Sequence, residues 1–273
     1  MIVLPALGTP AVEWVRVQRA LAVVTDAITV LVDCKGIGWS DPAPWPRTPT
    51  TMADELDRLI AALGIEDPAI LVGHSSGGLI ARLYAARHRD HVAHLVLVDA
   101  THEDHGHVLP RFDPTLTSRE FWIRAAWWRL RVLGAYRLLV ALGRVPDLRR
   151  SAEREVPAEL VEAYVARALT TACRRAVVQE LFGLLYGMAP MRSQARDLGN
   201  LPITVVTVGP TGRDRWYEGW LELQADFLRM STNTHQVWAK HADHHINHDD
   251  PGCLAQVLHD GIGQAMDDSQ PAP

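Results

Sequence analysis

The chain of 273 residues is poor in cysteine and has no excess of basic residues. Its three cysteines, Cys34, Cys173 and Cys253, contain no C-x-x-C pair. This argues against a disulfide framework and a cysteine-based zinc site, and it favours a reducing cytoplasm. The formal net charge of -5 provides no attraction toward the phosphates of nucleic acid. We therefore expect a cytoplasmic protein that does not bind nucleic acid.

Long apolar runs are also missing. The most apolar helix-like stretch, residues 138–142, is bounded by Arg137 and Arg144, whereas crossing a bilayer takes about 20 residues. The first residues lack the basic region of a signal peptide, and Pro5 interrupts their apolar run. No stable membrane insertion is expected. Hydrophobic residues nevertheless make up 48% of the chain, which is sufficient for a globular core.

Short β-branched runs alternate with stretches of helical period, which is typical of parallel strands joined by crossover helices. The runs cover residues 1–4, 28–32, 69–72, 93–98, 203–208 and 235–240. A helix is predicted over 53–63, with a capping box at Thr51 and a stop at Gly64. Another is predicted to begin after Asp250, with Pro251 as its first residue.

The strand pattern disappears between residues 101 and 201, where only helical period remains. This stretch is too long for a simple crossover and predicts an inserted helical cap. Its helices are expected over 117–143 and 157–187, the second broken near Thr171. The remaining segments, 1–100 and 202–266, form the predicted α/β core, and the polar tail 267–273 is expected to be disordered.

The pentapeptide G-H-S-S-G, centred on Ser75, follows one predicted strand and precedes a helical stretch. In this context G-x-S-x-G marks a sharp turn that lifts the serine hydroxyl above the end of the sheet. The start of the helix also favours developing negative charge. The pattern predicts that Ser75 is a nucleophile.

Two further segments accompany this turn: D-x-x-G-x-G-x-S-D at residues 33–41 and L-V-L-V-D-A at 95–100. With residues 240–251, they resemble the α/β-hydrolase superfamily, specifically its actinobacterial-type serine hydrolases. The resemblance implies an α/β-hydrolase fold with an eight-stranded, mostly parallel sheet and a Ser/acid/His triad. It leaves the predicted cap largely unassigned.

The predicted nucleophile needs a base, and the base needs a carboxylate. His244 follows the last predicted strand, where the family shows S-G-H-x-I, and His245 is the next candidate. For the acid, Asp99 ends the strand after the nucleophile helix, where a subset of the superfamily places its carboxylate. Asp214 occupies the commoner position in a longer loop. We favour Ser75, Asp99 and His244 as the catalytic residues.

An oxyanion hole needs two N–H donors. One is expected from the backbone of Ser76, directly after the nucleophile. The other is expected from the loop after the first strand, where the family carries H-G-x and this chain has Leu7. Because the donor belongs to the main chain, the hole can survive a change of side chain.

The 13 histidines invite a metal interpretation, especially around residues 102–107 and 241–248. Neither cluster reproduces H-x-H-x-D-H or H-E-x-x-H, so we expect no catalytic metal and no cofactor. The predicted cap also carries aromatic residues among arginines, a pattern that suits a lid on the core better than a membrane-bound helix. These aromatics are Phe121, Trp122, Trp127, Trp128 and Tyr136.

The hairpin of two strands that usually precedes the segment matching residues 1–4 is missing. In the strand order of the superfamily it pairs with residues 28–32, so its loss leaves an apolar edge. We expect that a second copy in a homo-oligomer or a cap segment covers this edge, or that the natural chain begins upstream.

Taken together, the residues predict a serine hydrolase that cleaves an ester, lactone or thioester bond of a small, largely apolar substrate. A serine nucleophile argues against dehalogenase and epoxide-hydrolase chemistry, which needs a carboxylate. The same triad could instead serve acyl transfer, C–C hydrolysis or a lyase or cyclisation step. A non-catalytic ligand-binding relative is the other alternative.

Overall fold

The computed structural model describes residues 1–42, 44–105, 148–209 and 215–268. Within them six parallel strands form one sheet in the order β2-β1-β3-β4-β5-β6. The strands are β1 (Ile2–Leu4), β2 (Val30–Leu31), β3 (Ala69–His74), β4 (Val92–Val98), β5 (Ile203–Val208) and β6 (Thr234–Ala239). Each predicted strand is present, and the mostly parallel α/β architecture is confirmed.

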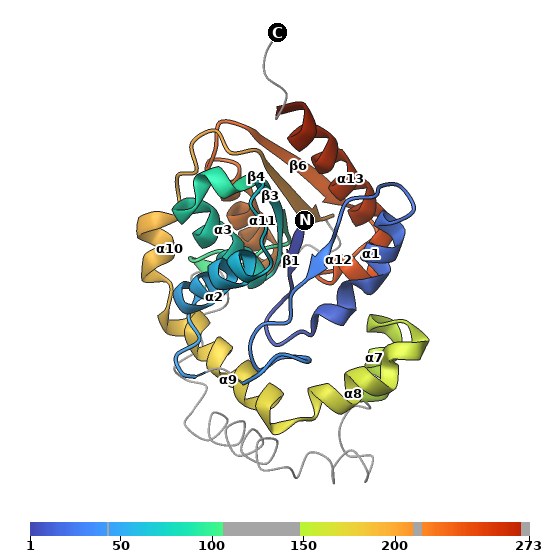
Figure 1. Ribbon diagram of the computed structural model, residues 1–273. Helices are drawn as coiled ribbons and strands as arrows, with labels where there is room; N and C mark the ends of the chain where they lie inside the picture. Colours follow the sequence, from blue (N-terminus) through green and yellow to red (C-terminus); the bar gives the residue numbers. More distant parts are fainter. Residues whose placement is uncertain (43, 106–147, 210–214, 269–273) are drawn as a thin grey trace.

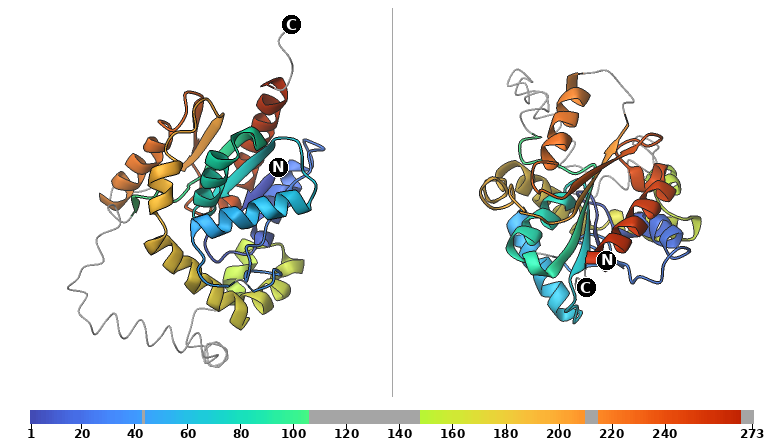
Figure 2. Two further views of the ribbon diagram at one scale, coloured as in Figure 1. Left: turned by 60° about the vertical axis from the view of Figure 1, so that its left-hand side comes forward. Right: turned by 90° about the horizontal axis from the view of Figure 1, so that it is seen from above.

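Helices cover both faces of the sheet (Figures 1 and 2). On one face lie α1 (Val15–Leu21), which follows a 3-10 turn η1 (Ala11–Trp14), and α13 (Pro251–Asp268). The other face carries α2 (Pro49–Ala62) and α3 (Gly77–Arg87), and Phe227 of α11 (Arg215–Phe227) joins their core cluster. Strands β3 and β4 are almost wholly buried, as expected of parallel strands covered on both sides.

The start of α2 corrects one prediction from the sequence. The helix begins at Pro49 rather than at residue 53, because Thr48 is its N-cap and forms a capping box with Thr51. Thr51 is therefore the third residue of the helix rather than its cap. Gly64, with φ of 63°, adopts the left-handed conformation that ends the helix as predicted.

The described part of the predicted cap is entirely helical or irregular. It contains α7 (Leu148–Glu155), η3 (Ala158–Leu160), α8 (Val161–Ala168), α9 (Thr171–Tyr186) and α10 (Ala189–Gln194). Thr170 caps α9 through the N–H of Cys173, which confirms the predicted break near Thr171. The predicted helix over 117–143 and its aromatic residues lie outside the described residues. The domain boundaries stay a prediction.

Helices α8 and α9 lie beyond the carboxyl ends of the strands (Figure 1). The loops that leave the strands at this end therefore face the helical segment, whereas Met1 and Met266 of α13 lie together toward the opposite end. None of the helices in the described ranges is both long enough and apolar enough to cross a bilayer.

Strand β2 is the edge of the sheet, and its only partner in the described chain is β1. Ile28, which precedes it, is 80% exposed. That a second copy or a cap segment covers this edge stays a prediction. The predicted disordered tail lies mostly outside the described residues, since α13 continues to Asp268.

Candidate active site

Ser75 occupies the turn between β3 and α3 with a φ of 50°, a left-handed value that is rare for a residue other than glycine. Its N–H donates to the carbonyl of Val98 at 3.1 Å, and its own carbonyl accepts from Thr101 at 2.9 Å. A Cβ at Gly77 would collide with the carbonyl oxygen of Leu4, and a Cβ at Gly73 would approach Gly78 to 2.6 Å. The turn is therefore held by close backbone contacts that only glycine permits.

Asp99 lies at the end of β4, directly beside this turn, and is buried to 1% exposure. One carboxylate oxygen lies 2.6 Å from Nδ1 of His244, and the other accepts a hydrogen bond from Nε1 of Trp220 at 2.9 Å. Asp99 also has a left-handed φ, of 38°. Both oxygens of the carboxylate are thus partnered, and the ring of His244 is oriented by one of them.

His244 lies in the loop after β6, which is anchored on both sides. Its N–H donates to the carboxylate of Asp243, whose own N–H donates to Asp249. Its carbonyl accepts a hydrogen bond from Nε2 of the buried His74 at 2.9 Å. Burial, and after it the neighbouring His244, hold the pKa of His74 well below its ordinary value. A neutral His74 can support this loop without repelling a protonated His244.

Three residues predicted from sequence, Ser75, Asp99 and His244, follow the carboxyl ends of β3, β4 and β6, and Asp99 and His244 are in direct contact. Within the described residues, the hydroxyl of Ser75 has Thr101 Oγ1 as its hydrogen-bond partner, at 3.3 Å. The alternative base His245 lies beside His244, with ring centroids 5.4 Å apart. The alternative acid Asp214 lies outside the described residues.

The two predicted oxyanion donors, Leu7 and Ser76, line the same narrow hollow of about 20 Å³. Neither backbone N–H has an acceptor among the described residues. An oxyanion hole requires N–H groups without a protein acceptor, and the role of these two stays a prediction. The wall of the hollow is mainly apolar, with Met52, Ile80 and Leu184 among its residues.

A buried charge cluster adjoins this hollow, and the sequence analysis missed it. Glu180 of α9 is 5% exposed and accepts the N–H of Gly8 at 2.9 Å. Arg47, fully enclosed, forms an ion pair with Glu55 at 3.1 Å and lies 3.6 Å from Glu180. Burial raises the pKa of Glu180, although the hydrogen bond from Gly8 opposes the rise. Helix α9 thereby restrains the loop that carries Leu7.

The residues of the D-x-x-G-x-G-x-S-D segment support this same region. The carboxylate of Asp33 accepts the N–H groups of Ala11, at 2.7 Å, and Trp39, at 2.9 Å. It therefore ties the loop after β2 to the turn before η1. Nearby, a Cβ at Gly36 would meet Ala176 of α9 at 2.7 Å. The motif serves to pack two loops and the helical segment together.

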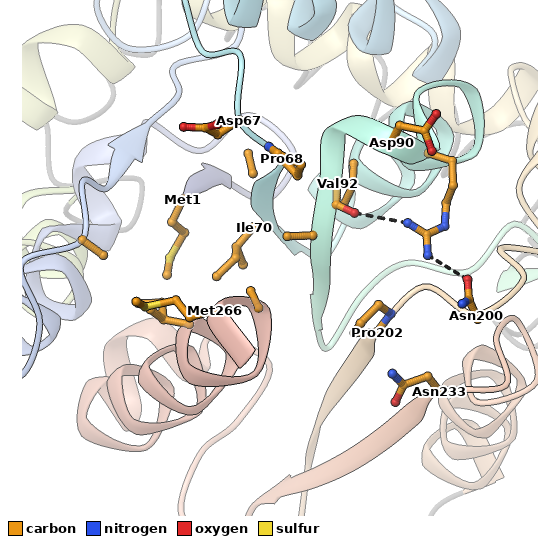
Figure 3. A pocket seen from close by; sticks show the side chains of 16 residues that line it. Met1, Asp67, Pro68, Ile70, Asp90, Val92, Asn200, Pro202, Asn233 and Met266 are labelled. Atoms are coloured by element: carbon orange, nitrogen blue, oxygen red, sulfur yellow. Dashed lines mark hydrogen bonds between the residues drawn. The ribbon is translucent and has the colours of Figure 1, made fainter. Parts of the chain in front are cut away.

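A large hollow lies elsewhere, at the amino ends of the strands (Figure 3). It measures about 860 Å³. Met1, Pro68 and Pro202 line it, each just before a strand, and Arg89 crosses it to Asn200 at 3.1 Å. Ser75 and His244 leave their strands at the opposite end. This hollow is therefore separate from the candidate site.

Comparison with known proteins places this geometry in a family. The family model of the alpha/beta hydrolase fold matches residues 1–144, more than half of the chain, and the chain belongs to this family. An uncharacterised protein of Bacillus subtilis, YqjL, is 22% identical over 93% of this chain and 79% of its own length. The (lyso)-N-acylphosphatidylethanolamine lipase of Homo sapiens is 26% identical over 83% of this chain and 68% of its own.

Other similarities are shorter or structural. Epoxide hydrolase 3 of Xenopus tropicalis is 36% identical over 33% of this chain and 26% of its own length, and the match to a Schizosaccharomyces pombe protein spans 16% of that protein. Among solved structures, an esterase from Thermogutta terrifontis aligns with a TM-score of 0.62 at 20% identity, over 97% of this chain and 89% of its own. The epoxide hydrolase CorEH aligns with a TM-score of 0.68 at 18% identity, over 96% and 90%. At these identities the solved structures show the shared fold.

Proposed function

We propose that this protein is a serine hydrolase that cleaves an ester-type bond of a small, largely apolar substrate through an acyl-enzyme on Ser75. The observation that carries the proposal is a strained serine turn beside the buried Asp99, which contacts the partly exposed His244. A carboxylate on Nδ1 fixes the tautomer whose Nε2 accepts a proton.

In the proposed reaction the hydroxyl of Ser75 turns from Thr101 toward Nε2 of His244 and attacks the substrate carbonyl carbon. His244 takes the hydroxyl proton as the C–O bond forms. It then gives the proton to the departing alcohol oxygen as the acyl–oxygen bond breaks. Water, activated by the same imidazole, adds to the acyl carbon and releases the acid and Ser75. Apo geometry of this kind often tightens only when substrate is bound.

The negative charge on the carbonyl oxygen is proposed to be held by the N–H groups of Leu7 and Ser76. Both line one hollow and have no acceptor among the described residues. The loss of a single donor of this type costs about 10²- to 10³-fold in kcat. We also propose that residues 101–201 act as a cap, because α9 supplies Glu180 to the loop beside Leu7.

The identity of the nucleophile separates this proposal from the epoxide hydrolases among the similar proteins. Hydrolysis through an alkyl-enzyme needs a carboxylate nucleophile, whereas this chain carries Ser75 on its strained turn. An esterase and a lipase among the similar proteins agree with acyl chemistry. We therefore propose a carbonyl-bearing substrate rather than an epoxide.

Labelling with a fluorophosphonate probe tests the proposal directly. The purified protein is expected to be labelled, and Ser75→Ala is expected to abolish labelling and to lower turnover of p-nitrophenyl esters on the order of 10⁶-fold. Ser76→Ala is the matched control, because its proposed contribution is a backbone N–H. A folded protein that resists the probe would instead indicate a non-catalytic ligand-binding relative. A chain-length series of p-nitrophenyl esters then defines the acyl group.

A further inference from the structure

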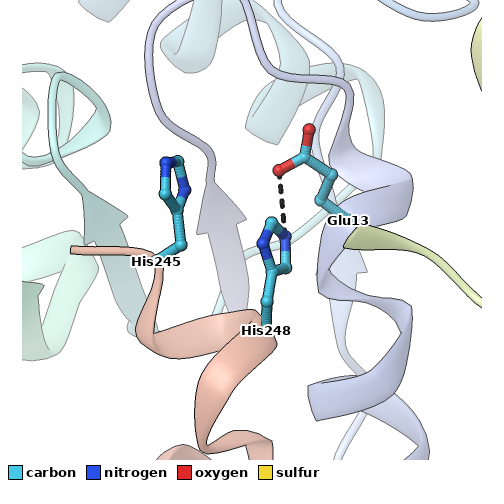
Figure 4. Close-up of side chains that lie close together, drawn as sticks. All are labelled: Glu13, His245 and His248. Atoms are coloured by element: carbon cyan, nitrogen blue, oxygen red, sulfur yellow. Dashed lines mark ion pairs between the residues drawn. The ribbon is translucent and has the colours of Figure 1, made fainter. Parts of the chain in front are cut away.

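A second cluster of titratable side chains lies next to the proposed catalytic histidine, His244, and takes no part in the proposed reaction. It consists of Glu13 from η1 and of His245 and His248 at the start of α12 (Ile246–Asp249), as Figure 4 shows. Each residue offers one ligand atom, and these atoms all lie within 4.8 Å of one another. Two imidazoles and a carboxylate are a ligand set that zinc accepts readily.

The side chains of the cluster are held in place from both sides. The rings of His245 and His248 are nearly parallel, with an interplanar angle of 4° and centroids 5.4 Å apart. One oxygen of Glu13 accepts the hydroxyl of Tyr164 at 2.7 Å. The other oxygen faces Nε2 of His248 at 3.0 Å. A carboxylate oriented in this way through one oxygen presents the other to a metal.

The contact between Glu13 and His248 leaves a polar atom unsatisfied. The side chain of His248 is 8% exposed. Its Nε2 nevertheless has no hydrogen-bond partner among the described residues, although the carboxylate of Glu13 is close. A buried imidazole nitrogen without a hydrogen bond is costly. An ion placed between this nitrogen and the carboxylate would satisfy both atoms.

The charge around the cluster also favours a cation. Glu13 has no ion pair with arginine or lysine within the described ranges. Glu155 lies close enough that, together with burial and Glu13, it raises the pKa of Tyr164. Two carboxylates therefore surround one tyrosine hydroxyl. No arginine or lysine within the described ranges contacts Glu13 to balance the negative potential at this point.

A second group of possible metal ligands in the described chain differs from this one in its neighbouring charges. His102, Glu103 and Asp104 also bring their ligand atoms within 4.8 Å. There, however, Arg82 pairs with Glu103 at 2.8 Å, and Arg196 pairs with both carboxylates. These guanidinium groups already occupy the positions that a metal would take. The cluster around Glu13 is therefore the better metal site.

We propose that Glu13, His245 and His248 bind one zinc ion, with water as the fourth ligand. Ligand atoms of a tetrahedral zinc site are about 3.3 Å apart, given bonds of about 2.0–2.1 Å. Glu13 and His248 already approach this separation at 3.0 Å. His245, whose ring is stacked on that of His248 at the partly exposed edge of the cluster, would complete the set by turning a ring nitrogen toward the ion. Its open side admits the water.

The ion would act as a structural clamp. It joins η1, which follows the loop of Leu7, to the loop that carries His244, and it reaches α8 through the hydrogen bond from Tyr164 to Glu13. These segments are far apart in the sequence. Zinc bound to the folded protein and not to the unfolded chain raises the midpoint of thermal unfolding. This role is independent of the reaction at Ser75.

Zinc titration of the chelator-treated full chain by isothermal calorimetry tests the site. We expect one equivalent of zinc per chain with micromolar or tighter affinity, and a higher unfolding midpoint in its presence. His245→Ala and His248→Ala are each expected to weaken binding at least tenfold and to remove the rise in the unfolding midpoint. His235→Ala, an exposed histidine on β6, is the matched control and should bind as the parent does.

Because His248 and Glu13 are buried, the exposed His245→Ala variant keeps the test decisive if the other variants fail to fold. Unchanged zinc affinity in folded His245→Ala would overturn the proposal, as would the absence of binding heat in the parent protein. Magnesium provides a further check, since it prefers oxygen ligands. Equal binding of magnesium and zinc would be incompatible with a site built on two imidazoles.

Discussion

Two carboxylate–imidazole pairs, each with a buried carboxylate, include a histidine from the segment that follows β6. Asp99 contacts His244 at 2.6 Å and accepts the indole N–H of Trp220. Glu13 contacts His248 at 3.0 Å and accepts the hydroxyl of Tyr164. In each pair one carboxylate oxygen faces an imidazole and the other faces an aromatic donor. The same arrangement of carboxylate, imidazole and aromatic donor thus occurs twice.

The third group at each pair makes the difference. Beside the first pair lies Ser75 on a strained turn, whereas beside the second lies another imidazole, that of His245. A hydroxyl next to an oriented imidazole suits nucleophilic attack, and a second imidazole suits metal binding. A histidine oriented by a buried carboxylate can therefore serve either catalysis or metal binding, and the neighbouring side chain decides which.

The largest expected effect follows from breaking each pair at its carboxylate. Asp99→Asn should lower kcat on the order of 10⁴-fold, because an amide favours the wrong tautomer of His244. Glu13→Gln should act mainly on stability and lower the free energy of unfolding by about 1–3 kcal/mol, since a buried charged partner is lost. Steady-state hydrolysis of p-nitrophenyl acetate and thermal unfolding of both variants provide the measurements.

Two outcomes would contradict that contrast. Full activity in Asp99→Asn would transfer the role of the acid to Asp214. A loss of turnover in folded Glu13→Gln as deep as that in Asp99→Asn would show that the second pair belongs to the reaction.

The aromatic donors offer a smaller and matched pair of changes. Trp220→Phe removes the N–H donated to Asp99, so the carboxylate orients His244 less firmly. We expect kcat to fall about 10- to 100-fold with KM little changed, as for the loss of one hydrogen bond to a charged group. Tyr164→Phe removes the corresponding donor to Glu13 and should lower the unfolding midpoint. An equal loss of kcat in Trp220→Phe and Tyr164→Phe would contradict the assignment of only the Asp99–His244 pair to the reaction.

A third buried carboxylate, Glu180, sharpens the comparison because it accepts a backbone N–H and lies beside Arg47, with no imidazole as a partner among the described residues. Glu180→Ala removes the acceptor of the Gly8 N–H and should lower kcat about tenfold by loosening the loop of Leu7. Glu180→Gln keeps an acceptor oxygen and is expected to recover most of that loss. If both variants have the same kcat, the charge rather than the hydrogen bond would be responsible. Full kinetics of both variants separate the two explanations.

The smallest effect concerns His74, which lies between the pairs, 5.2 Å from the ring of His244 and 6.0 Å from that of His245. Its pKa in the folded protein is well below the ordinary value, which is about 6.5 in the unfolded chain. The unfolded chain therefore takes up a proton as the pH falls below about 6.5, whereas the folded protein does not. Stability is complete above this pH and declines below it.

His74→Gln removes this titration and should make the decline shallower by up to about 1.4 kcal/mol per pH unit. Some decline should persist, because the pKa of His102 is also lowered, chiefly by burial. Urea unfolding at a series of pH values between 7 and 5 measures the slope. An identical slope in the parent and in His74→Gln would show that His74 contributes nothing to it.

Short-range patterns carried most of what could be predicted. The six strands follow from runs of β-branched residues, and the turn of Ser75 follows from five consecutive residues between a strand and a helix. Asp99 was predicted because it ends a strand, and His244 because it follows the last strand at the place where the family shows S-G-H-x-I. Parallel strands bring such residues to one edge of the sheet. The start of α2 was misplaced because Thr48 and Thr51 both suit a capping box. The residue order does not say which of them is the cap.

The sequence by itself therefore determined the strands, the serine turn and the candidate triad, since their signals lie within a few residues. Only the tertiary structure decided which side chains support them. Glu180 meets Gly8 across 172 positions, Trp220 meets Asp99 across 121, and Tyr164 meets Glu13 across 151. No short sequence pattern predicts such distant partners. They are selected by burial, which makes an unpartnered charge or N–H costly and so requires a distant residue to satisfy it.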